Sequence, residues 1–139
     1  MRKIFLVLIF TFSIVSSLNA TSAKFIKEMN YESDYKTALE KAKKANKSVF
    51  MVVSETTCPW CRKLERQTLK KKNINSIIKE NFIPLSVEKD INNYPKQFET
   101  KVVPTIFFID PKDETIIKKV LGYKNKKDFK NILEEVVSK

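Results

Sequence analysis

Apolar positions along the chain follow two spacings, one typical of helices and one of buried strands. Residues 34–46, DYKTALEKAKKAN, place apolar side chains three and four positions apart, which predicts a helix. Ser33 or Asp34 can cap its start, and Asn46 can take the left-handed exit conformation. Residues 48–54, SVFMVVS, form a continuous apolar run, which predicts a strand buried on both faces, as in parallel sheets.

The remaining segments continue this pattern. We expect strands at residues 82–88, 105–110 and 115–122. We expect helices at residues 59–71, at a short stretch capped by Asn73, and from Asn125 or Lys126 to Val137. The polar residues 89–101 predict a loop with a short helix, and residues 111–114 predict a turn. This order predicts an α/β fold with a central mixed parallel and antiparallel sheet flanked by helices.

The first 20 residues have the layout of a secretory signal peptide. A basic start, Met1-Arg2-Lys3, precedes a mostly apolar stretch and a small, polar exit that ends at Ala20. The apolar stretch is shorter than the roughly 20 residues that span a bilayer. Cleavage after Ala20 or after Ala23 fits this layout, and an uncleaved N-terminal anchor is the alternative. We therefore expect a signal peptide at residues 1–20 and one domain at residues 21–139.

The charge of the chain is basic throughout. Removing Arg2 and Lys3 from the 27 basic residues leaves 25 against 16 acidic ones, a net charge of +9. The lysines are scattered and interleaved with acids, and the tight run at residues 70–72 falls at a predicted helix end, where cations are favoured. This pattern favours a solvated basic surface over a nucleic-acid site, although such a surface can help to recruit acidic partners.

The two cysteines, Cys58 and Cys61, lie in SETTCPWCRKLE, and the chain contains no histidine. Structural zinc needs four nitrogen or sulfur ligands, so we expect no metal and no other cofactor. A static disulfide staple is a weaker interpretation, because so short a loop gains little chain entropy from cross-linking. A reactive dithiol fits better: Pro59 suits a first helical turn, so Cys58 would meet free backbone N–H groups that stabilise its thiolate. Cys58 should then attack a disulfide, and Cys61 should resolve the adduct.

These residues resemble the thioredoxin superfamily, and more narrowly exported thioredoxin-like proteins with a cysteine–X–tryptophan–cysteine centre. The matching pieces are KANKSVFMVVS, CPWCRKLE, NFIPLSVEKD and VVPTIFFID, within residues 31–137. The resemblance implies a thioredoxin-like fold, an exposed nucleophile at Cys58 and a buried resolving thiol at Cys61. It also implies a cis bond between Val103 and Pro104, which leaves the preceding backbone free to bind substrate.

Two further residues have two interpretations each. Trp60 is either a shield or docking surface beside the sulfur, or an ordinary half-buried aromatic side chain. Glu65 follows Cys61 by one helical turn, where related exported reductases carry an acid. It is either a partly buried carboxylate that exchanges a proton with Cys61 or a solvated helix charge. Arg62 and Lys63 are expected at the surface.

The sequence departs from thioredoxins proper at three places. Val52 stands where they carry a buried acid, so that proton carrier is either missing or replaced by Glu65 or Glu55. The glycine usual before the cis-proline is absent, and so is a glycine in the turn at residues 111–114. These departures weaken an expectation of general thioredoxin activity but leave the dithiol chemistry in place.

The sequence therefore predicts a periplasmic thiol–disulfide oxidoreductase that reduces or exchanges protein disulfides. Its expected partners are protein disulfide or dithiol substrates and a membrane or periplasmic electron donor. Nucleic acid is not expected, and a membrane only if the signal segment stays uncleaved. The alternatives are a dithiol oxidase and a non-catalytic binding module with a redox-sensitive disulfide. The residues between the cysteines tune the potential over a wide range, so the sequence leaves the direction open.

Overall fold

The computed structural model describes residues 20–91 and 93–139. The predicted signal peptide lies outside these residues, apart from Ala20, where the first helix begins. No helix in the described ranges is both long and apolar enough to cross a bilayer.

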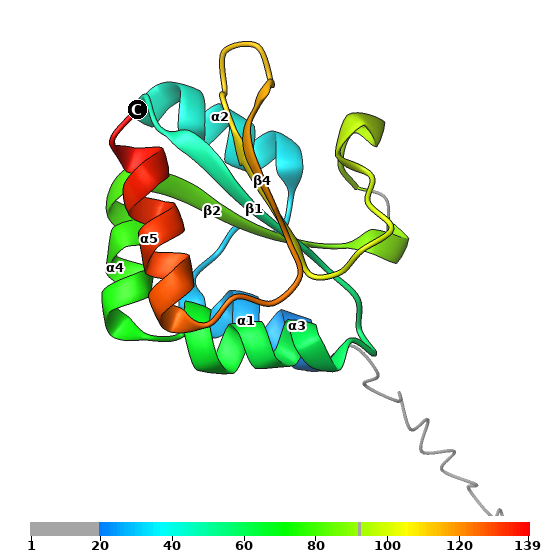
Figure 1. Ribbon diagram of the computed structural model, residues 1–139. Helices are drawn as coiled ribbons and strands as arrows, with labels where there is room; N and C mark the ends of the chain where they lie inside the picture. The colour runs from blue at the N-terminus through cyan, green and yellow to red at the C-terminus, as the bar shows by residue number, and fades with distance from the viewer. Residues whose placement is uncertain (1–19, 92) are drawn as a thin grey trace, which may run out of the picture.

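A four-stranded sheet in the order β2-β1-β3-β4 forms the centre of the molecule (Figure 1). The strands are β1 (Ser48–Ser54), β2 (Phe82–Glu88), β3 (Thr105–Ile109) and β4 (Ile116–Leu121). β1 pairs in parallel with β2 and antiparallel with β3, and β3 pairs antiparallel with β4. The mixed sheet predicted from the sequence is confirmed, and β1 lies between two partners with six of its seven residues buried.

Helices cover both faces of the sheet. They are α1 (Ala20–Met29), α2 (Tyr35–Ala45), α3 (Pro59–Leu64), α4 (Lys72–Asn81) and α5 (Lys126–Val137). Buried residues of α1, α3, α4 and α5 form one hydrophobic cluster with the sheet, and we call this side the four-helix face. Buried residues of α2 form a second cluster with the opposite side, which we call the α2 face. Figure 1 shows α4 and α5 side by side on the first of these faces.

Side-chain caps define two of the helices where the sequence predicts them. The Asp34 carboxylate accepts a hydrogen bond from the Thr37 backbone N–H at 2.7 Å, and Asn46 ends α2 with a left-handed φ of 52°. Asn125 accepts from the Asp128 N–H at 3.0 Å and caps α5. Because these oxygens satisfy N–H groups that a helix leaves unpaired, they stabilise the ends of α2 and α5.

The prediction differs from the structure at three helices. α4 begins at Lys72 after an uncapped Lys71, so Asn73 lies inside the helix rather than at its cap. The predicted helix at residues 59–71 is α-helical only to Leu64 and continues as a π-helical segment, Glu65–Leu69. α1 was not predicted from the apolar spacing. The predicted loop at residues 89–101 contains two 3-10 helices, Lys89–Ile91 and Lys96–Phe98.

Candidate functional site

The two cysteines form a disulfide at the start of α3. Cys58 is the N-cap residue in an extended conformation, and Pro59 takes the first helical position, where its missing N–H is not needed. Their Cα atoms are 5.2 Å apart. The Cys61 backbone N–H points at the Cys58 Sγ atom, 3.1 Å away. A thiolate at Cys58 would therefore accept a hydrogen bond from the backbone at the positive end of the helical segment.

Cys58 is less exposed than the expected nucleophile. Its exposed fraction is 8%, against 1% for Cys61. The reason is local: the Cys58 N–H donates to the Glu55 carbonyl at 3.3 Å, and the sulfur turns back onto the first helical turn. Cys58 is nevertheless the more exposed of the two cysteine residues, which is the order that attack followed by resolution requires.

A groove of about 430 Å³ joins this helix to the proline loop. Its lining residues are Trp60, Val102, Val103, Gly122 and Tyr123. Trp60 is 55% exposed, which fits both a docking surface and a half-buried aromatic side chain. The groove thus brings together two of the residues predicted to contact substrate, one from the cysteine motif and one from the proline loop.

The proline loop has the conformation that the resemblance implies. The Val103–Pro104 peptide bond is cis. The Gly122 N–H donates to the Pro104 carbonyl at 2.8 Å, and Gly122 itself has a φ of 72°, which a residue without a side chain adopts at least cost. This hydrogen bond ties the end of β4 to the loop that faces the groove.

Lys63 does not lie on the open surface as expected. Its ammonium nitrogen lies 4.8 Å from the ring centroids of both Trp60 and Tyr123. The two rings are themselves 5.8 Å apart. A cation is attracted to the negative face of an aromatic ring, so Lys63 contributes to holding the two aromatic side chains together.

Glu65 is the one buried charged side chain among the residues that the structure describes. Burial raises the pKa of its carboxyl to about 7, and the nearby Arg62 guanidinium opposes that rise. The interpretation of Glu65 as a solvated helix charge is therefore wrong. Glu55, the other candidate, is paired instead with Lys89 at 2.8 Å. Val52, where thioredoxins proper carry an acid, is buried and apolar as expected.

Arg62 was expected at the surface, but its side chain is mostly buried and contacts the site. One guanidinium nitrogen lies 2.8 Å from the Glu65 carboxylate, and another donates to the Glu55 carbonyl at 3.2 Å. Arg62 and Glu65 also line a cavity of about 210 Å³ that Phe25 of α1 helps to close. Arg62 therefore links the Glu65 carboxylate to the loop that precedes Cys58. Part of the burial of Glu65 comes from α1.

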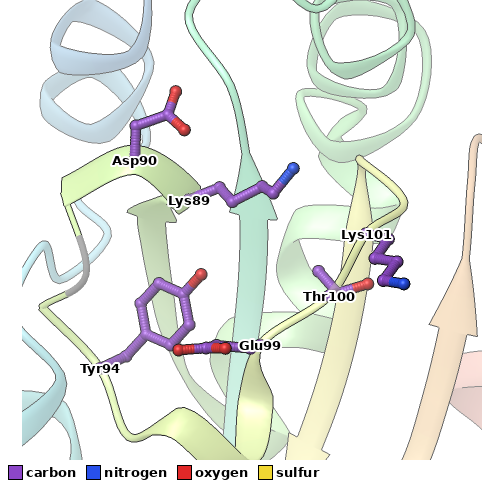
Figure 2. A pocket seen from close by; sticks show the side chains of 6 residues that line it. All are labelled: Lys89, Asp90, Tyr94, Glu99, Thr100 and Lys101. Carbon is purple, nitrogen blue, oxygen red and sulfur yellow. The ribbon is translucent and has the colours of Figure 1, made fainter.

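A second, polar cavity is lined by residues that precede the proline loop in the sequence. Figure 2 shows the side chains that line its volume of about 600 Å³: Lys89, Asp90, Tyr94, Glu99, Thr100 and Lys101. It contains two basic and two acidic side chains, whereas the lining of the groove at Trp60 contains no charged one. Glu99 points toward Tyr94 in this view, and Lys101 points the other way (Figure 2).

Residues 20–91 and 93–139 contain no group of three or more histidine, cysteine or carboxylate side chains arranged to hold a metal ion. The described site brings together two sulfurs, a buried carboxylate and the groove at Trp60.

Comparison with known proteins identifies the family. The model of the thioredoxin-like domain matches residues 35–137. The chain belongs to the thioredoxin-like domain family. The fold is accordingly thioredoxin-like, with its four-stranded mixed sheet between helices, and the disulfide occupies the cysteine motif of that fold.

Solved structures share the fold at low sequence identity. A thioredoxin from Thermus thermophilus is 20% identical, with a TM-score of 0.66 over 76% of this chain and 85% of its own. The oxidised C-terminal domain of Neisseria meningitidis DsbD is 19% identical, with a TM-score of 0.61 over 76% of this chain and 97% of its own.

A curated relative matches a shorter stretch. Spermatogenesis-associated protein 20 of Rattus norvegicus is 36% identical over 53 residues, which are 38% of this chain and 7% of that protein. The matched stretch is thus a small fraction of the relative, and its other regions have no counterpart in the match.

Several residues of the site were not singled out from the sequence. Lys63 and Arg62 each lie three positions from their partners, Trp60 and Glu65, and that helical spacing was the available signal. Tyr123 comes from the far end of the hairpin, and no local pattern connects it to the cysteines.

Proposed function

We propose that this protein is an exported thiol–disulfide oxidoreductase that reduces or exchanges disulfides of other proteins. The observation that carries the proposal is the position of Cys58. Its sulfur caps a helical segment and accepts a hydrogen bond from the Cys61 backbone N–H at 3.1 Å. Trp60, two residues later in the sequence, lines an open groove. A sulfur in such an environment has a lowered pKa and reacts as the thiolate near neutral pH.

The proposed reaction has two exchange steps. The Cys58 thiolate attacks one sulfur of a substrate disulfide, so that a mixed disulfide forms and the other substrate sulfur leaves as a thiolate. The Cys61 thiolate then attacks the Cys58 sulfur, which restores the Cys58–Cys61 disulfide and releases the second substrate thiolate. The substrate is reduced by two electrons and the protein is oxidised by two. Renewed turnover requires a dithiol donor, which we expect to be a membrane or periplasmic protein.

Glu65 is proposed as the proton acceptor for Cys61. The two residues lie one helical turn apart, and the Glu65 backbone N–H bonds to the Cys61 carbonyl. A carboxyl with a pKa of about 7 is divided between its two protonation states near neutral pH, where a buried thiol must lose a proton to attack. Glu65→Gln should therefore slow the release step while Cys58 still forms the mixed disulfide.

The predicted signal peptide supports export, and periplasmic location is part of the proposal. Fractionation of cells that express the full chain tests it, with mass spectrometry of the recovered protein to identify its N-terminus. Recovery of the uncleaved chain in the membrane fraction would contradict a cleaved periplasmic protein and indicate a membrane-anchored one.

The activity is tested with the purified protein, dithiothreitol as donor and insulin as disulfide substrate. Wild type should reduce insulin, whereas Cys58→Ser and Cys61→Ser should both lose turnover. Cys61→Ser should in addition accumulate a covalent adduct with substrate, because the resolving thiol is missing. Equal rates for wild type and both variants would contradict the enzyme and favour a binding module.

The reactivity of Cys58 gives an independent test. In the reduced protein, its alkylation rate should titrate with a pKa well below the value of about 8.5 of a free cysteine. The reduction potential measured against glutathione then decides between a reductase and a dithiol oxidase, because a strongly stabilised thiolate favours the reduced protein and makes it the more oxidising partner.

A further inference from the structure

The cavity beside Glu65 is lined mainly by basic side chains. Four of the six residues around its volume of about 210 Å³ are basic, and the other two are Glu65 and Phe25 of α1. The basic residues are Lys24, Arg62, Arg66 and Lys70. The larger polar cavity at Tyr94, in contrast, contains equal numbers of basic and acidic side chains. A concave surface lined by one sign of charge raises the local concentration of ions of the opposite sign, so the cavity beside Glu65 attracts anions.

The π-helical segment Glu65–Leu69 brings two of these residues together. The Lys70 N–H donates to the Glu65 carbonyl at 2.9 Å, a bond that spans five residues instead of four. Residues five positions apart lie on different faces of a regular α-helix, so the wider turn lets both side chains line one cavity. Single π-helical turns within α-helices occur frequently at functional sites. Thiol–disulfide exchange at the cysteines leaves this turn without a role of its own.

The positive charge of the cavity is only partly neutralised. Lys24 and Lys70 share the exposed carboxylate of Glu28, which lies 3.7 Å from the Lys24 ammonium nitrogen. A third cation is the arginine that pairs with Glu65. Arg66 is exposed and forms no ion pair with any residue in the described ranges. Two carboxylates thus face four cations, and an excess of two positive charges remains even when both carboxylates are ionised.

Glu65 makes the charge of the cavity depend on pH. Burial raises the pKa of its carboxyl to about 7. Arg62 and Lys70 oppose this rise and Glu88 of β2 adds to it, while α1 contributes Lys24 to the same lining. An anion bound beside Glu65 would repel the carboxylate and favour the protonated form. Because such coupling is reciprocal, protonation of Glu65 would in turn strengthen the binding of the anion.

We propose that this cavity binds a small oxyanion of the sulfate or phosphate type, and that binding is coupled to the uptake of a proton by Glu65. The guanidinium group of Arg66 can hold two oxygens of such an ion at once, and the Lys70 ammonium adds a point charge. The volume suits a small ion, since pockets for larger organic ligands span about 300–1,000 Å³. The inference goes beyond the proposed oxidoreductase function and is independent of it, because binding is measured in the oxidised protein.

The test is a sulfate titration of the oxidised full chain, followed by the NMR shifts of backbone amides. Sulfate keeps its charge between pH 6 and pH 8, and chloride at equal ionic strength controls for screening. Saturable shifts should appear around Arg66 and Lys70. The affinity should be higher at pH 6 than at pH 8 by roughly fivefold, the lower end of the range typical of coupled sites. Absence of saturable shifts, or the same shifts with chloride, would overturn the proposal.

Charge variants locate the anion. Arg66→Gln should weaken sulfate binding by roughly two- to fivefold, the size expected for the loss of one exposed ion pair. Glu28→Gln should strengthen it by a similar factor, because it releases Lys24 and Lys70 from a competing carboxylate. Lys43→Gln, which changes an exposed lysine on α2, should leave it unchanged. Weaker binding in Glu28→Gln, or equal losses in Lys43→Gln and Arg66→Gln, would contradict a site in this cavity.

Glu65→Gln tests the coupling to the proton. Glutamine mimics the protonated carboxyl, so this variant should bind sulfate at pH 8 as wild type does at pH 6. Calorimetry near pH 7 in two buffers of different protonation enthalpy should detect proton uptake by wild type on binding and none by Glu65→Gln. A pH dependence that persists in Glu65→Gln would show that another group takes up the proton and would contradict the coupling.

Vesicles identify the source of the oxyanion. The phosphate group of an anionic lipid has the same chemistry as the free ion, so phosphatidylglycerol vesicles are compared with inorganic phosphate at equal phosphate concentration. Stronger binding to the vesicles supports a lipid headgroup in the cavity, and stronger binding of inorganic phosphate supports the free ion. Phosphatidylcholine vesicles control for adhesion without net charge. Binding in both arms that Arg66→Gln leaves unchanged would place the phosphate outside this cavity and overturn the proposal.

Discussion

The two faces of the sheet bury apolar surface in similar ways but differ in their polar content. On the four-helix face, aromatic rings surround Phe50, with centroid distances of 5.5 to 6.4 Å. The same side of the molecule buries the Glu65 carboxylate and a Tyr31 hydroxyl without a hydrogen-bond partner in the described ranges. On the α2 face, the Tyr35 hydroxyl donates to Glu114 at 2.7 Å. The α2 face also buries a Tyr94 hydroxyl without a partner in the described ranges, so the faces differ in the buried carboxylate rather than in unpartnered hydroxyl groups.

The largest expected effect compares two neighbours on β1. Phe50 and Met51 are both fully buried and point to opposite faces. Phe50→Ala should lower the free energy of unfolding by about 3–5 kcal/mol and Met51→Ala by about 2–5 kcal/mol. The aromatic contacts of Phe50 place its loss at the upper end, which urea unfolding of both variants would measure. A larger loss for Met51→Ala would show that the α2 face carries the main core.

Glu65 gives a prediction about pH. Its pKa is raised to about 7 in the folded protein from an ordinary value of 4.5, so folding favours the protonated form. The contribution of this carboxyl to the free energy of unfolding is therefore fully present below about pH 4.5 and is lost as the pH rises through about 7. In Glu65→Gln the loss of stability between pH 5 and pH 8 should be smaller by about 1–2 kcal/mol, because glutamine does not titrate. The difference is no larger because residual solvent and Arg62 screen the carboxylate charge.

Urea unfolding at the two pH values, with Glu55→Gln as the control, checks this prediction. Glu55 lies in the same region but is half-exposed and paired with Lys89, so its removal should leave the slope of stability against pH as in wild type. An unchanged slope in Glu65→Gln would show that the carboxyl is solvated in solution.

Two tyrosines sharpen the comparison further. Tyr31→Phe removes a buried hydroxyl that has no partner among the described residues, so it should be neutral or stabilising. Tyr35→Phe removes the hydrogen bond to Glu114 and should cost about 1 kcal/mol. Thermal unfolding of the two variants side by side measures the difference. Equal destabilisation would mean that the Tyr31 and Tyr35 hydroxyl groups are equally well satisfied in solution.

A further small effect is expected at the start of α5, on the four-helix face. Asn125→Ala removes the cap from the Asp128 N–H and should cost about 1 kcal/mol. Asn125→Ser retains a capping oxygen and should recover most of it. Denaturant midpoints of the two variants test the cap. A loss in both would assign the effect to the Asn125 side-chain bond with the Asp128 carboxylate, which lies 2.7 Å away.

The sequence predicts the strands and the caps well because both depend on local patterns. The continuous apolar runs at residues 48–54 and 82–88 coincide with β1 and β2, and Asp34 and Asn125 cap helices where expected. The cysteine motif likewise lies at a strand-to-helix junction that can be read locally.

The environment of Glu65 could not be predicted in this way. Its burial depends on α1, whose few apolar residues lie next to the predicted signal segment, and on the π-helical segment, which has no distinct sequence pattern. The positions of Lys63 and Tyr123 depend on contacts between distant elements. Helical spacing predicts which residue each charged side chain contacts, but it does not predict how deeply that side chain is buried.

Gly122 has a consequence for how this site can diversify. A Cβ atom added there would meet no other atom within 4 Å, so the position restricts backbone conformation and not volume. A side chain would cost roughly 1–2 kcal/mol of backbone strain, least for asparagine or aspartate. Because Gly122 lines the groove, a side chain there would change the lining of the groove. A single substitution can therefore alter this surface without replacing either cysteine, and its cost lies in the backbone rather than in packing.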